Sequence, residues 1–109
     1  MACAQRRHAG WAGVDGVGGA LADAGSRFAV VLQSDSVALS TWLVAPTSTS
    51  ALAASFRPEI EVLGQRTRVL AEQTAAVDPQ RLGEAAGRLT YEEMRNVRAA
   101  LRLVLGLTR

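Results

Sequence analysis

The stretch Arg27-Phe-Ala-Val-Val-Leu32 decides the fold class of this 109-residue chain. Its apolar, partly β-branched residues end at Ser34-Asp35-Ser36, a sequence typical of turns. A short apolar run that ends at a turn predicts a buried strand. This run, Phe28 to Leu32, is also the longest uninterrupted apolar segment, whereas a membrane-spanning helix needs about 20 such residues. We therefore expect no transmembrane segment.

Further short elements are expected downstream of this strand. Thr41-Trp-Leu-Val-Ala45 is a second strand candidate, which Pro46 should end because proline cannot donate to a central ladder. Ile60 and Val62 alternate with glutamates, a pattern that predicts a strand with one solvent-facing side. The remaining predictions are a turn at Gly64, a further strand or a bent pair over 68–73 and 74–77, and a helical turn at 80–82 after Asp78-Pro79.

A helix is predicted from about Tyr91 to Leu107. Thr90-Tyr-Glu-Glu93 is a capping box, in which the threonine hydroxyl and the glutamate carboxylate satisfy free backbone donors. The core side of this helix is expected to carry Met94, Val97, Leu101 and Val104 or Leu105. The solvent-exposed face is expected to carry Arg95, Arg98 and Arg102. Strands followed by one terminal helix predict a mostly β (α+β) fold, a small barrel-like sheet with the helix packed against it.

The composition is that of one globular domain: 49% of the residues are hydrophobic and 20% are charged. Residues 1–25 differ, because Gly and Ala account for 13 of them and no period is visible, so this divergent region is expected to be loop-like or poorly ordered, with a degenerate first strand and loop. Residues 26–109 are expected to form the folded domain. Arg6 and Arg7 are followed by glycines and by Asp15 instead of the apolar core of a signal peptide, which favours a cytoplasmic protein.

The chain has few residues for thiol, imidazole or metal chemistry. Cys3 is the only cysteine and His8 the only histidine, so one chain cannot build a disulfide framework or a Cys/His metal cage. Both lie in the irregular N-terminal region, so we do not expect a Ser-His-Asp or Cys-His enzyme. The net charge is +2 at pH 7 and the calculated pI is about 9.5. This charge permits a polyanionic partner but is weak evidence for one.

Five blocks of the sequence, taken in order, resemble the MazF/PemK family of toxins. The blocks are Arg27-Phe-Ala-Val-Val-Leu-Gln-Ser-Asp35, Leu43-Val-Ala-Pro-Thr-Ser-Thr-Ser50, Val69-Leu-Ala-Glu-Gln73, Leu82-Gly-Glu-Ala-Ala-Gly-Arg-Leu89 and the capped C-terminal helix. The resemblance covers roughly residues 25 to 107. It implies an SH3-like or CcdB-like β-barrel with a C-terminal helix, which forms a homodimer and is inhibited by a MazE-like antitoxin. It also implies a sequence-selective endoribonuclease that cleaves single-stranded RNA without a metal or other cofactor.

The resemblance also implies site residues. Arg27 stands where the family has its catalytic arginine, at the head of the strand, with Phe28 in place of the usual proline. The family's catalytic hydroxyl follows the next strand, which corresponds to Ser48, with Thr47 and Thr49 as register alternatives. Glu72 and Gln73 match the pair that lies near the RNA groove, and Ser50 is a further RNA-binding candidate.

Two other functions stay open. Family members open with an Arg-Gly-acidic block and a Gly-Ser-Glu loop, and residues 8–26 show neither. Either divergence or a shifted reading frame upstream of Arg27 would explain this difference. The chain could therefore be an inactive relative that only binds the antitoxin. Alternatively, the barrel could poison a protein target such as DNA gyrase, as the CcdB family does, although that family depends on a tryptophan near its C-terminus that is missing here.

Overall fold

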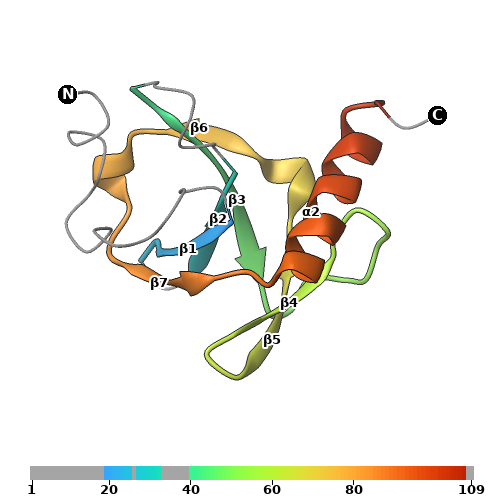
Figure 1. The fold of residues 1–109 in the computed structure, drawn as a ribbon, viewed down its shortest axis with the longest axis horizontal. Helices are drawn as coiled ribbons and strands as arrows, with labels where there is room; N and C mark the ends of the chain where they lie inside the picture. The colour runs from blue at the N-terminus through green and yellow to red at the C-terminus, as the bar shows by residue number, and fades with distance from the viewer. Residues whose placement is uncertain (1–18, 26, 33–39, 108–109) are drawn as a thin grey trace.

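A computed structural model describes residues 19–25, 27–32 and 40–107. In these ranges seven antiparallel strands form a sheet in the order β4-β5-β3-β2-β1-β7, and β6 pairs with β3 off this path. The strands are β1 (Ala20–Asp23), β2 (Phe28–Val31), β3 (Trp42–Ser48), β4 (Glu59–Val62), β5 (Gln65–Val69), β6 (Ala75–Val77) and β7 (Ala85–Arg88). The sheet curls into a half-barrel, and helix α2 (Tyr91–Val104) lies beside it (Figure 1). The predicted fold class is confirmed.

Strand β2 is buried on both faces. Val31 packs in a cluster with Trp42 and Leu82, whereas its neighbour Val30 packs in a second cluster with Ile60 and Val97. A strand with two buried faces carries a continuous apolar run, which explains why this segment is uninterrupted by polar residues. Trp42 is only 1% exposed in the single chain, so it is a core residue and not an interface residue.

Strand β3 continues through Pro46, so the prediction that this proline ends the strand was wrong. On one edge β3 pairs with β2, and on the other it pairs first with β6, as far as Val44, and then with β5, from Thr47. Pro46 lies where the second partner changes. There its carbonyl accepts a bond of 2.8 Å from the Leu70 N–H, and the Leu70 carbonyl accepts from the Gln73 N–H at 2.9 Å, so that carbonyl has a donor although Pro46 lacks an N–H.

Two strands were not predicted at the positions where they lie. Ala20–Asp23, in the region expected to be loop-like, is strand β1 and pairs with β2 and β7; residues 1–18 of that region lie outside the described residues. Strand β7, Ala85–Arg88, was missed because alanine and glycine have low β-propensity. Burial decides β1, since Ala20 and Ala22 are fully buried, whereas β7, whose residues are half-buried or exposed, forms through its pairing with β1.

The segment after Gly64 is a strand followed by a turn and a shorter strand. Strand β5 begins earlier than predicted and ends at Val69, and Ala71–Gln73 form a 3-10 turn, η1, before β6. The second 3-10 turn, η2 (Pro79–Arg81), matches the predicted helical turn, and the Asp78 side chain caps it by accepting from the Gln80 N–H. The predicted turn at Ser34–Ser36 lies outside the described residues.

Helix α2 has the predicted capping box. The Thr90 hydroxyl accepts from the Glu93 N–H at 3.0 Å, and the Glu93 carboxylate accepts from the Thr90 N–H at 2.9 Å. The other oxygen of that carboxylate accepts from the Glu61 N–H, which ties the helix to β4. The helix ends at Val104, three residues before the predicted end. Val104 or Leu105 was expected on the core side, but both are exposed, whereas Ala100 is buried.

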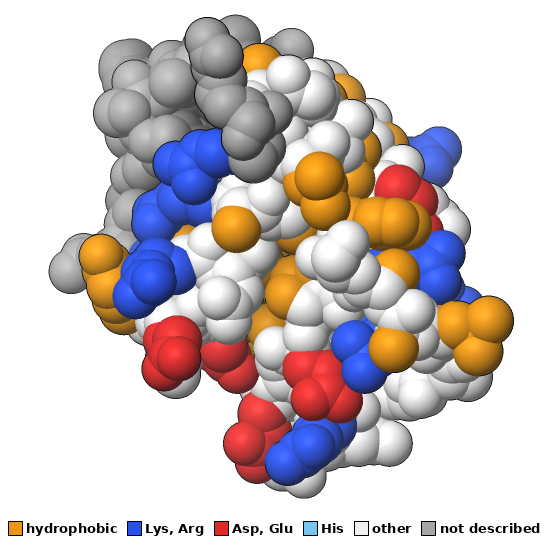
Figure 2. Space-filling view, turned by 90° about the vertical axis from the view of Figure 1, so that its right-hand side faces the viewer, with side chains coloured by type: hydrophobic (Ala, Val, Ile, Leu, Met, Phe, Trp, Pro, Cys, Tyr) orange, Lys and Arg blue, Asp and Glu red, His pale blue; other side chains and the backbone are white. Residues whose placement is uncertain are grey.

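The surface carries exposed apolar side chains. Large exposed ones include Leu52, Leu63 and Tyr91 and, at the end of α2, Leu103, Leu105 and Leu107. Figure 2 shows that apolar side chains reach the surface between arginines and acidic side chains on the face that lies to the right in Figure 1. Among the described residues, no helix has the length and apolar character needed to cross a membrane.

Candidate functional site: a pocket with one arginine and several hydroxyls

One pocket of about 240 Å³ brings together the start of β2, the end of β3 and the β4–β5 hairpin. Its described lining consists of Arg27, Phe28, Thr47, Ser48, Thr49, Ser50, Val62, Gln65 and Thr67. The lining therefore includes the predicted arginine together with all three candidates for the predicted hydroxyl. It also includes Ser50, one of the three RNA-binding candidates.

Strand register places Arg27 near Ser48. The β2–β3 ladder pairs Ala29 with Pro46, so continuing it by two residues brings position 27 opposite position 48. The Arg27 carbonyl accepts from the Ala24 N–H at 2.9 Å, which holds the turn that leads into β2. The Arg27 side chain is exposed, and no hydrogen bond or ion pair joins its guanidinium to another described residue. This guanidinium is therefore available to a ligand.

The candidate hydroxyls differ in their availability. Thr47 is buried, 3% exposed, and its hydroxyl donates to the Phe28 carbonyl at 2.7 Å. Ser48 is half-buried, and its oxygen accepts from the Ser50 N–H at 3.2 Å in a local side-chain turn. Thr49 is exposed. The Thr47 hydroxyl has a structural bond. The Ser48 hydroxyl lies 3.4 Å from that of Ser50, and it can donate its proton to a ligand when Ser50 is the donor in that contact.

The electrostatics of the pocket favour an anion. Among the residues that the structure describes, Arg27 is the only charged side chain in the lining, and no Asp or Glu is present there. Hydroxyl groups donate hydrogen bonds to anionic oxygens, and a guanidinium can contact two such oxygens at once. The arrangement can therefore bind and orient a phosphate-sized group.

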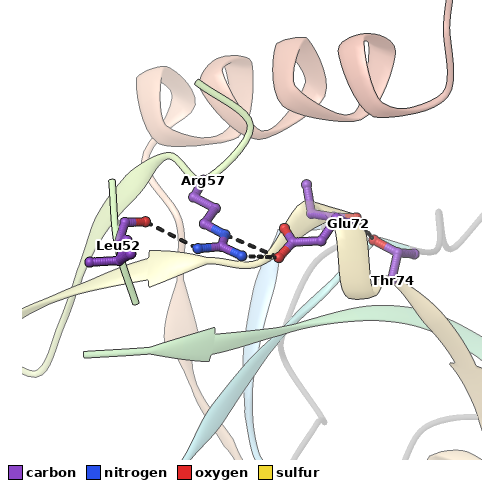
Figure 3. Close-up of polar contacts among 5 residues, drawn as sticks. Leu52, Arg57, Glu72 and Thr74 are labelled. Carbon is purple, nitrogen blue, oxygen red and sulfur yellow. Dashed lines mark hydrogen bonds and ion pairs between the residues drawn. The ribbon is translucent and has the colours of Figure 1, made fainter. Parts of the chain in front are cut away.

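Glu72 and Gln73 lie outside this pocket, on η1. Figure 3 shows Glu72 facing Arg57, whose Nε and Nη2 atoms donate to its Oε2 atom at 3.0 and 2.7 Å. These bonds from Arg57 lower the pKa of Glu72 below its usual value of 4.5, although partial burial opposes the shift. Arg57 also donates to the Leu52 carbonyl, so the ion pair fastens the 49–58 loop to η1. Gln73 is exposed.

Sequence reasoning missed part of the pocket, namely the residues of the β4–β5 hairpin. Thr67 lies between Arg66 and Arg68, and it pairs with Ile60 on the buried side of the sheet. A threonine at an inward position between two charged residues is the signal that could have identified it. Within the described ranges, no group of three His, Cys, Asp or Glu residues could hold a metal ion.

Comparisons of the sequence identify relatives. Residues 11–105 match the family described as PemK-like, MazF-like toxin of type II toxin-antitoxin system. A protein of Mycobacterium tuberculosis, named provisionally as a toxin, is 40% identical over 84 residues, which are 76% of this chain and 79% of that protein.

Solved structures share the fold. MazE-MazF from Deinococcus radiodurans superimposes with a TM-score of 0.73 at 23% identity, covering 84% of this chain and 96% of that chain. A mycobacterial endoribonuclease in complex with its cognate antitoxin gives a TM-score of 0.75 at 16% identity, covering 85% and 97%. At these identities the structural likeness establishes the fold. The match over residues 11–105 goes further and shows that this chain belongs to the PemK-like, MazF-like family of type II toxins.

Proposed function

We propose that this toxin is a sequence-selective endoribonuclease that cleaves single-stranded RNA without a metal ion. The observation that carries the proposal is the pocket in which the Arg27 guanidinium, which has no partner among the described residues, lies near the available hydroxyl of Ser48. Further support comes from the solved structures of the same fold, one of which is a mycobacterial endoribonuclease. Arg27 and Ser48 are the proposed catalytic residues.

The proposed reaction uses the 2′-hydroxyl of the RNA as the nucleophile. This oxygen attacks the adjacent phosphorus and loses its proton, while the bond from phosphorus to the 5′-oxygen breaks and that oxygen gains a proton. The products are a 2′,3′-cyclic phosphate and a 5′-hydroxyl. The Arg27 guanidinium neutralises charge on the phosphoryl oxygens, and the Ser48 hydroxyl donates to a non-bridging or leaving oxygen. Because Arg27 acts here as a cation, water is the candidate both for the general base that takes the 2′-hydroxyl proton and for the acid that protonates the 5′-oxygen.

RNA contacts outside the pocket are also part of the proposal. Ser50 lies in the pocket lining, so it can contact the nucleotide next to the reacting phosphate. Glu72 and Gln73 lie on η1, and the Oε1 atom of Glu72 is buried with no hydrogen-bond partner among the described residues. That oxygen is an acceptor that a base edge could use.

A MazE-like antitoxin and a second copy of this chain are the proposed protein partners. Two of the solved structures of this fold are complexes, MazE-MazF from Deinococcus radiodurans and a mycobacterial endoribonuclease with its antitoxin. The exposed apolar side chains at the end of α2 offer surface for burial against a partner. A domain of this size has a limited core, so a symmetric dimer would stabilise it. We propose that these proteins act in the cytoplasm.

The test is cleavage of a long unstructured RNA in EDTA, with fragment ends mapped by sequencing. Wild-type protein should give discrete fragments, and Arg27→Ala should lower the rate by about 100-fold or more, as expected when one donor to the transition state is lost. The matched control is Arg95→Ala on the exposed face of α2, which should leave the rate unchanged. Intact RNA with tight antitoxin binding would favour the inactive relative. Inhibition of DNA gyrase without RNA cleavage would favour a CcdB-like toxin.

A further inference from the structure

Thr67 on β5 has a buried hydroxyl that the fold does not use. Its side chain is 6% exposed, and its Oγ1 atom has no hydrogen-bond partner in the described part of the chain. Thr47, which is buried to a similar extent, donates its hydroxyl to the Phe28 carbonyl. A buried polar atom without a partner costs free energy, and nearly all such atoms in folded proteins have one. The Thr67 hydroxyl therefore needs an explanation.

The position of this hydroxyl is set by strand alternation. Along β5, Arg66 and Arg68 form ion pairs with Glu59, whereas Thr67 faces the opposite side, where its partner in the ladder, Ile60, is buried. Thr67 is also part of the pocket lining that contains Arg27 and Ser48. Thr67, with its unused hydroxyl, thus borders the space in which a ligand of Arg27 would sit.

The surroundings of Thr67 suit a donor to an anion. The described pocket lining contains the Arg27 guanidinium and no carboxylate, so a bound group would carry negative charge. In a partly desolvated site, a hydrogen bond from a neutral hydroxyl to an anionic oxygen is strong. Valine has the shape of threonine and would fill the same space without the unpaired polar atom. A threonine here therefore lowers stability in the free protein, as is common at functional sites.

We propose that the Thr67 hydroxyl is a third substrate contact, which donates to a non-bridging oxygen of the phosphate held by Arg27 and Ser48. This inference rests on the proposed function. It assigns a role to a residue from a second region of the chain, so that the phosphate is held between the β2–β3 ladder and the β4–β5 hairpin. Binding of the phosphate satisfies the buried hydroxyl.

The test compares Thr67→Val, which removes the hydroxyl, with Thr67→Ser, which keeps it. Cleavage of the long unstructured RNA in EDTA should slow by roughly 10- to 100-fold in Thr67→Val, the range for one charge-assisted hydrogen bond, and stay near wild type in Thr67→Ser. Binding of inorganic phosphate is measured by titration, followed by amide NMR shifts. Phosphate should bind more weakly to Thr67→Val than to wild type, and Thr67→Ser should bind it like wild type. The Tm of Thr67→Val should equal or exceed that of wild type. Thr47→Val should lower the Tm, because it leaves the Phe28 carbonyl without its donor.

The outcomes separate this inference from the proposed function. If Thr67→Val cleaves RNA and binds phosphate like wild type, the inference is overturned and the endoribonuclease proposal stands. If wild type does not cleave RNA but binds phosphate in a Thr67-dependent way, the endoribonuclease proposal fails and the anion contact is supported. The inference is also overturned if Thr67→Val loses activity only together with a fall in Tm, or if the wild type does not bind phosphate.

Discussion

Replacing Arg57 with methionine removes the guanidinium that fastens the 49–58 loop to η1 while keeping most of the side-chain stem. In the wild type, two N–H groups of Arg57 donate to one oxygen of Glu72, and a third donates to the Leu52 carbonyl at 3.2 Å. The guanidinium also lies 5.5 Å from the centre of the Phe56 ring. All of these contacts are lost in Arg57→Met, and the Glu72 carboxylate is left without its partner.

The magnitude follows from the geometry and the exposure of the pair. A hydrogen bond to a charged group contributes about 1.5–3 kcal/mol. The Arg57 and Glu72 side chains are 25% and 26% exposed, so solvent screening reduces this value. We expect Arg57→Met to lower the free energy of unfolding by about 2–3 kcal/mol, because it also leaves a partly buried carboxylate unpaired. A double-mutant cycle with Glu72→Gln should give a coupling energy of about 1–2 kcal/mol.

The coupling should depend on pH in a defined direction. The pKa of Glu72 is lower in the folded protein than its ordinary value of 4.5, because Arg57 stabilises the carboxylate. Such a group contributes its stability above pH 4.5, and this contribution is lost as the pH falls through the lowered pKa of the folded state. Stability of the wild type should therefore decline faster below pH 4.5 than that of Glu72→Gln.

Urea denaturation at pH 7 and at a series of lower pH values measures both effects. The matched control is the ion pair between Arg66 and Glu59, which is 3.6 Å long and has an arginine side chain that is 81% exposed. Its cycle should give a coupling energy of about 0–0.5 kcal/mol, as exposed pairs do. A coupling between Arg57 and Glu72 that does not exceed the control, or that persists unchanged in acid, would refute the reasoning.

Two further predictions concern stability. Thr90→Ala should lower the free energy of unfolding by about 1 kcal/mol, since the Glu93 N–H loses its acceptor, and urea denaturation with Thr90→Ser as the control would check this. An unchanged midpoint would show that the cap is not needed. Leu63→Asn should raise the free energy of unfolding by about 0.5–1 kcal/mol, because Leu63 has a φ of 52° at the first position of the two-residue β4–β5 turn and its side chain is 77% exposed. A lower Tm for Leu63→Asn would mean that the exposed leucine makes a stabilising contact.

The sequence by itself predicted the elements whose signals are local. The apolar run that became β2, the alternation of β4 and the capping box of α2 depend on residues close together in the chain, and each is present as predicted. Arg27 and the hydroxyl segment 47–49 were found through their resemblance to a known family, and the structure places them in the lining of one pocket.

Tertiary structure alone decided the remaining features. Strands β1 and β7 are rich in alanine, so their sequences carry no strong β signal, and they form because they pair with neighbouring strands. The continuation of β3 past Pro46 depends on a change of partner strand that no local pattern reveals. Thr47 and Thr67 both line the pocket, but their hydroxyls differ for the same reason: strand pairing gives that of Thr47 a carbonyl partner, whereas that of Thr67 has none among the described residues. Local sequence sets which residues can form a strand, but the pairing of distant strands sets which side chains meet.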